Sequence, residues 1–101
     1  MSFIHDDDQS SSIAVEVRNT VRAYVVGDLL LGIDAERAEA ASFIEAGVLD
    51  STGAMELVGF LEQAFSISIA DAEIVPDNLD SLEGIVAFVV RKLKTTNNPV
   101  E

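Results

Sequence analysis

The stretch FIEAGVLDSTGAMELVGFLEQAFSISI, residues 43–69, decides the fold that we predict for this chain. Its middle part carries apolar residues at spacings of three and four, which is typical of one buried face on a helix over residues 51–66. The residues of that inward face are Ala54, Leu57, Val58, Leu61 and Phe65. Ile67 and Ile69 then alternate with Ser68, and with no partner strand in view we predict an extended linker that buries both isoleucines.

Two more helices are predicted, one on each side of this stretch. The serines at 10–12 are good N-caps for a first helix, and Gly32 is suited to end it. Its apolar face consists of Ile13, Val17, Val21, Tyr24, Val25 and Leu29. Asp80 or Ser81 caps the last helix, with Glu83 supporting its first turn. Its apolar face consists of Leu82, Ile85, Val86, Val89 and Leu93.

The long connection over residues 32–50 has no strong regular pattern, and connections of this length are usually functional. We expect a short helical turn over the alanine-rich residues 35–41, and a second one over residues 76–79, where Pro76 opens it. Four apolar residues of the connection should fold back onto the core: Phe43, Ile44, Val48 and Leu49. The predicted fold is all-α, a small four-helix bundle with three long helices and one short one.

The length of 101 residues fits one domain. We expect a disordered acidic arm over residues 1–11, the folded domain over residues 12–94 and a flexible tail over residues 95–101. The absence of cysteine excludes disulfides, thiolate metal sites and a thiol nucleophile in the polypeptide.

The net charge of −12 makes binding to nucleic acid or anionic lipid unfavourable and favours partner proteins with basic patches. The longest apolar stretch, residues 24–33, is interrupted by Gly27, Asp28 and Gly32 and is too short to span a bilayer. Asp6–Asp8 stand where a signal peptide would carry positive charge, so we expect a cytoplasmic protein without membrane insertion.

Ser51 is the main candidate site residue, because it lies where the long connection ends and a helix begins. Its hydroxyl can be exposed there on a fixed backbone, and the first-turn N–H groups favour an anion such as a phosphodiester. Asp50 adds a carboxylate that could help to bind Mg²⁺ when a phosphoryl-linked group is delivered. Asp-Ser before an apolar helix is also a common N-cap arrangement, so a purely structural role stays open at this point.

The wider pattern resembles the acyl and peptidyl carrier protein family, which bears phosphopantetheine attachment domains. The resemblance rests on residues 43–51, on Glu56-Leu57-Val58, on Leu61-Glu62 with Phe65, on residues 67–69 and on residues 76–82, and it extends from about Ile13 to Leu93. It implies a four-helix bundle in which Ser51 receives 4′-phosphopantetheine from coenzyme A by a phosphopantetheinyl transferase. Acyl or aminoacyl groups then hang as thioesters on the thiol of this arm, and the chain itself is a stand-alone carrier and no enzyme.

The resemblance also implies that the second helix is the docking face for partner enzymes, and that the carrier is a monomer. Its outward residues are Thr52, Met55, Glu56, Glu62 and Gln63. Many carriers have leucine directly after the serine, whereas this chain has Thr52, and Gly59 stands where a bulkier apolar residue is frequent. Similar carriers with such a small polar face are often dedicated ones, loaded by an adenylating acyl or amino acid ligase or an acyltransferase. Synthase or transferase enzymes of fatty acid, polyketide or nonribosomal-peptide-like pathways then use the cargo.

Three other functions are compatible with parts of the sequence. An acidic helical adaptor without a prosthetic group would use Ser51 only as a cap and Met55 as part of a plain binding surface. An enzyme is disfavoured because the only histidine, His5, lies in the predicted arm, where no Ser/His/Asp set can be built around it. A metal site is disfavoured because Asp77–Asp80 lacks the alternating ligands and central glycine of an EF-hand loop.

Overall fold

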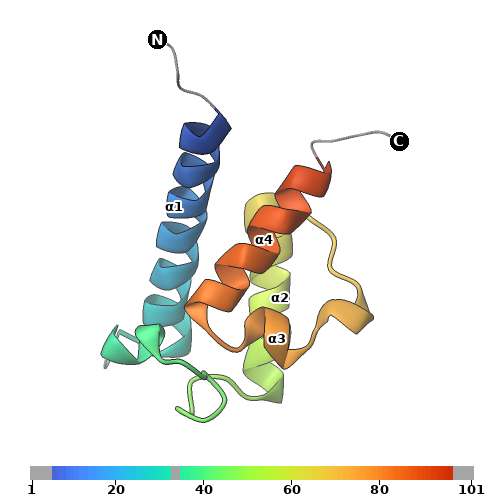
Figure 1. Cartoon of the computed structure of the whole chain (residues 1–101). Coiled ribbons are helices and arrows are strands. Elements are labelled where there is room, and N and C mark those ends of the chain that lie inside the picture. The colour runs from blue at the N-terminus through green and yellow to red at the C-terminus, as the bar shows by residue number, and fades with distance from the viewer. Residues whose placement is uncertain (1–5, 33–34, 97–101) are drawn as a thin grey trace.

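The computed structural model describes residues 6–32 and 35–96. In that part of the chain it contains helices and no strand, which confirms the predicted all-α bundle with three long helices and one short one (Figure 1). The four α-helices are α1 (Asp6–Tyr24), α2 (Ser51–Phe65), α3 (Pro76–Leu79) and α4 (Leu82–Thr96). Short turns of other helical types are η1 (Val25–Leu29), η2 (Ala35–Glu39) and η3 (Asp71–Glu73).

Helix α1 and the turn η1 after it use the predicted apolar face, with Val17, Val21 and Val25 buried in the core, and α4 lies alongside α1 (Figure 1). The helix continues directly into the π-helical turn η1. The helical segment ends before Gly32, which has a φ of 77°. The helix begins at Asp6, not at the serines 10–12, so residues 6–11 of the expected disordered arm are helical. The sequence has acidic residues at positions 6–8, and negative charge is favourable in the first turn of a helix. Residues 1–5, with His5, and residues 97–101 of the expected tail lie outside the described part.

Helix α2 spans nearly the predicted residues, and Leu57, Val58 and Leu61 are buried. Ser66 ends it in a left-handed conformation. The following linker then buries Ile67 and Ile69, as predicted.

Helix α3 is the predicted single turn with Pro76 at its start. Ser81 caps α4, since the Gly84 N–H donates to the Ser81 hydroxyl at 3.0 Å. Phe88 is buried although it was not among the predicted core residues, so the apolar face of α4 is broader than expected.

The connection between η1 and α2 is part of the core, with Phe43, Val48 and Leu49 buried. The prediction for Ile44 is wrong: it is 52% exposed, because the chain turns there and Phe43 takes the inward position. The alanine-rich turn η2 is present as predicted, and its Glu39 carboxylate accepts hydrogen bonds from Arg18 at 2.8 Å and Arg22 at 2.7 Å. This double ion pair ties the connection to α1.

We expect the ion pairs of Glu39 with Arg18 and Arg22 to weaken in acid. Hydrogen bonding by Arg22 and then Arg18 holds the pKa of Glu39 below its ordinary value of 4.5. Because the folded pKa is depressed, its stabilisation is present above the unfolded value and is lost as pH falls through the folded value. Glu39→Gln should therefore lower the free energy of unfolding at pH 7 by at most about 1 kcal/mol, since the pair is largely exposed. Urea titrations should show this difference shrinking as the pH falls below the ordinary pKa of 4.5; a difference that does not depend on pH would contradict the assignment.

Candidate functional site

Ser51 is the first residue of α2, and Asp50 before it is the N-cap. Asp50 has an extended backbone, and its Oδ1 accepts the Gly53 N–H at 2.8 Å. The capping role left open for Ser51 therefore belongs to Asp50. Ser51 is exposed, and within residues 6–32 and 35–96 its hydroxyl has no hydrogen-bond partner. The hydroxyl is thus available for chemistry.

The segment in front of Ser51 is held firmly on the core. Gly47 has a φ of 76°, which a residue with a side chain adopts only at a cost, and Arg37 donates a hydrogen bond to the Ala46 carbonyl in the same turn. The Val48 and Leu49 N–H groups then both donate to the Phe43 carbonyl, at 2.8 and 3.2 Å. Since both side chains are also buried, Ser51 follows a well-anchored stretch.

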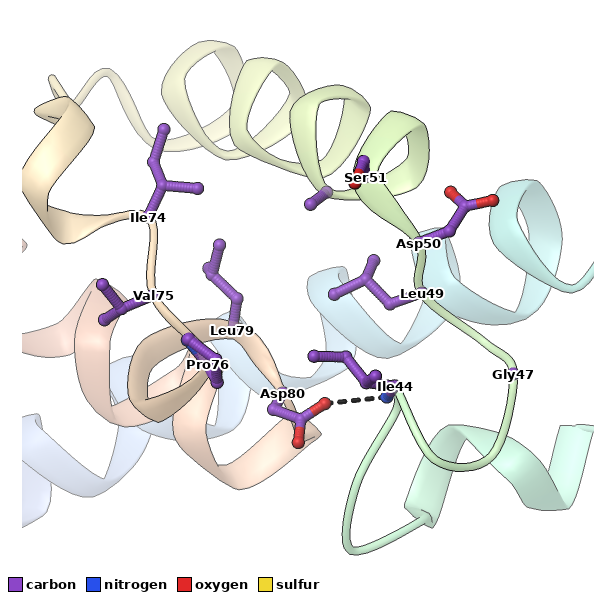
Figure 2. A pocket seen from close by; sticks show the side chains of 11 residues that line it. Ile44, Gly47, Leu49, Asp50, Ser51, Ile74, Val75, Pro76, Leu79 and Asp80 are labelled. Carbon is purple, nitrogen blue, oxygen red and sulfur yellow. Dashed lines mark hydrogen bonds between the residues drawn. The ribbon is translucent and has the colours of Figure 1, made fainter.

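A pocket of about 550 Å³ opens beside Ser51 (Figure 2). One side is formed by the start of α2 and the preceding loop, with Ile44, Leu49 and Ala54. The opposite side comes from the segment that leads into α3 and from α3 itself, with Ile74, Val75 and Leu79. The lining is mostly apolar, and its volume is in the range of small-ligand sites.

Two sets of polar contacts hold the pocket walls. Glu73 accepts the Ala70 N–H at 2.9 Å and Lys92 Nζ at 3.0 Å, which fixes the segment before Ile74; these contacts, the backbone one first, hold the pKa of Glu73 below its ordinary value. On the other side, the Asp80 carboxylate accepts the Ser42 hydroxyl at 2.6 Å and the Ile44 N–H at 2.8 Å. Figure 2 shows the second of these bonds.

The outward face of α2 is largely as predicted. Thr52, Glu56 and Gln63 are exposed, and Met55 is 58% exposed. Glu62 differs, because it is half-buried and its Oε2 accepts the Ile69 N–H at 2.9 Å. One of its oxygens thus serves to hold the linker after α2.

An aromatic pair joins α1 to α2 beside this face. Tyr24 of α1 stacks on Phe60 of α2, with ring centroids 4.2 Å apart. Burial, and then the carboxylates of Glu56 and Asp28, raise the pKa of Tyr24, so its hydroxyl stays protonated at neutral pH.

The described part of the chain is thus a small helical bundle with a free, exposed serine hydroxyl beside an apolar pocket. Among the described residues, no three His, Cys, Asp or Glu side chains are grouped to hold a metal ion, and no helix is long and apolar enough to cross a membrane. The sequence model of the phosphopantetheine attachment site family matches residues 28–89, more than half of the chain and including Ser51. The chain belongs to this family. No curated protein and no solved structure matches it.

Membership of the family defines the class of function. The chain is a carrier and not an enzyme, and the cofactor of such a domain is covalent 4′-phosphopantetheine. Carriers of this kind are modified by phosphopantetheinyl transferases and serve partner enzymes. The match favours the carrier over the adaptor without a prosthetic group.

Asp50→Ala should cost about 1 kcal/mol of unfolding free energy, because the Gly53 N–H loses its acceptor. Asp50→Asn should keep most of the stability, because an amide oxygen is as good a cap. Urea unfolding followed by circular dichroism measures both variants, with Asp71→Ala as a control that removes an exposed carboxylate. Equal losses for Asp50→Ala and Asp50→Asn would show that the charge, and not the cap, is what matters.

Proposed function

We propose that the chain carries acyl or aminoacyl groups as thioesters on a 4′-phosphopantetheine arm attached to Ser51. The observation that carries the proposal is the free, exposed Ser51 hydroxyl at the start of α2, on a backbone that Asp50 caps. The N–H groups of Ser51 and Thr52 lie in the first helical turn, where no intrahelical acceptor exists, so they suit a phosphodiester on Ser51. The second oxygen of Asp50, which the cap does not use, supports delivery of the group with Mg²⁺.

The pocket beside Ser51 supports a finer proposal about the cargo. Its apolar walls favour a short hydrocarbon chain over a charged group, because burial of apolar surface is favourable and burial of an unpaired charge is costly. We infer that the arm can fold back and shelter an apolar cargo there. Loading by an adenylating ligase or an acyltransferase, in a fatty acid, polyketide or nonribosomal-peptide-like pathway, completes the proposal.

Intact-mass measurement tests the carrier function. The protein is incubated with Mg²⁺, a broad-specificity phosphopantetheinyl transferase and either coenzyme A or hexanoyl-coenzyme A. We expect a gain of one phosphopantetheinyl group in the first case and of one hexanoyl-phosphopantetheinyl group in the second. Hydroxylamine should then remove only the hexanoyl group, which identifies a thioester. A folded protein that gains no mass with several transferases would refute the proposal.

The exposed face of α2 is the proposed docking surface for partner enzymes. Glu56 is exposed there, and the partner's surface should be basic, so Glu56→Lys should slow cargo transfer by about tenfold at low salt and by less at high salt. Glu16→Lys makes the same charge change on an exposed position of α1 and should have little effect. Transfer from the loaded carrier to its partner, followed at two salt concentrations, provides the measurement. Equal effects of the two substitutions would argue for net charge instead of a docking face.

A further inference from the structure

One residue in the wall of the pocket beside Ser51 is not held in place by burial. Ile44 lines the pocket but is 52% exposed, so apolar packing alone does not fix its position. Asp80 fixes it instead, from the junction where α3 ends and α4 begins. The Asp80 carboxylate accepts the Ser42 hydroxyl at 2.6 Å and the Ile44 N–H at 2.8 Å, and its backbone carbonyl accepts the Phe43 N–H at 2.6 Å.

The same residue connects the two sides of the pocket. Leu79, which lines the opposite side, directly precedes Asp80, and Asp80 itself also lines the pocket (Figure 2). The Ser42 hydroxyl in turn accepts the Glu45 N–H at 3.2 Å, so the turn over residues 42–45 is organised around one carboxylate. Asp80 therefore links the turn that carries Ile44 to the end of α3 that carries Leu79.

We propose that Asp80 is a positioning residue that sets the width of the pocket beside Ser51 and thereby determines which apolar cargo the carrier shelters from water. The proposal rests on the proposed function, because the cargo is the thioester carried at Ser51. Without the carboxylate, the turn over residues 42–45 loses two of its three bonds to Asp80 and Ile44 moves away from Leu79. A hexanoyl thioester is then less protected from water. An acetyl group is too short to contact the apolar walls, so its exposure to water does not change.

The first readout is amide hydrogen exchange by NMR on the protein without its arm. In Asp80→Ala, exchange at Ile44 should become about tenfold faster or more, because its N–H loses its hydrogen-bond acceptor. The core amides of α2 should keep their wild-type rates. Asp80→Asn should stay close to wild type, since its amide can accept the Ile44 N–H and donate to the Ser42 hydroxyl. Ser42→Ala, which leaves Asp80 in place, should show a smaller effect, and Asp71→Ala is the charge-matched control.

The second readout is the lifetime of the thioester after loading with hexanoyl- or acetyl-phosphopantetheine, followed by intact mass as water releases the acid and frees the thiol. Asp80→Ala should shorten the hexanoyl lifetime several-fold and leave the acetyl lifetime unchanged, with Asp80→Asn near wild type. A merely structural role would shorten both lifetimes together.

The outcomes separate the proposal from the function on which it rests. Unchanged exchange at Ile44, or faster exchange with an unchanged hexanoyl lifetime, would overturn the role of Asp80 while the carrier function stands. If the wild type takes up no acyl-phosphopantetheine, the carrier function fails and the cargo role of Asp80 fails with it. The exchange data then still decide whether Asp80 holds the turn.

Discussion

Ser51→Ala should take up no phosphopantetheinyl group and should fold like the wild type. The acceptor hydroxyl is absent in the variant, so the expected loss of loading is complete. The fold should persist because Asp50, and not Ser51, caps α2, and because alanine is a good residue for the first turn of a helix. We expect a change in unfolding free energy within about 0.5 kcal/mol. Intact mass after incubation with coenzyme A and a transferase measures the loading, and circular dichroism with urea measures the fold.

Thr52→Ala is the matched control for this variant, because Thr52 is the next residue and also carries an exposed hydroxyl. It should load like the wild type. If Ser51→Ala gains the same mass as the wild type, the arm is attached to another residue. An unfolded Ser51→Ala protein would indicate that Ser51 stabilises the fold, which would contradict the assignment of the cap to Asp50.

Phe43→Ala should be among the most destabilising single substitutions in this chain. Phe43 is fully buried although it lies in the connection before α2, and truncation of a buried phenylalanine costs about 3–5 kcal/mol. Since the total stability of a small domain is only about 5–15 kcal/mol, a large part of it would be lost. The anchor in front of Ser51 would be loosened as well, because the Val48 and Leu49 amides bind the Phe43 carbonyl. Urea unfolding at 25 °C provides the measurement.

Ile44→Ala is the comparison for Phe43→Ala, because it truncates the adjacent side chain, which is half exposed. Its cost should stay below about 1.5 kcal/mol, since little area becomes exposed. Similar losses of unfolding free energy for the two variants would contradict the structure, in which Phe43 is buried and Ile44 is half exposed.

The helices and the site were predictable because their signals are local. Apolar residues at helical spacing identified the faces around Val17, Leu57 and Ile85, which are buried. Pro76 and Ser81 marked the helix starts of α3 and α4 by chemistry that acts within one turn. The position of Ser51 at the start of α2 followed from the same kind of evidence.

Contacts between distant residues were not predictable. Asp80 reads as a helix cap in the sequence, and its bonds to Ser42 and Ile44 depend on how the connection folds back over the α3–α4 junction. The pairing of Glu39 with α1 has the same origin. Glu62 was placed on the docking face by helical spacing, but the path of the linker decides that its carboxylate binds the Ile69 amide. No spacing rule contains this information, and for that reason the pocket beside Ser51 was not predicted either.

Fragmentation mass spectrometry can locate the arm on the chain and so test its attachment to Ser51. The protein is loaded with coenzyme A by a transferase and digested, and the peptide that contains residues 50–52 is fragmented. We expect one phosphopantetheinyl group on the fragment that carries Ser51 and none elsewhere. A group found on another serine, such as Ser42 or Ser66, or a folded protein that never acquires the group, would contradict it.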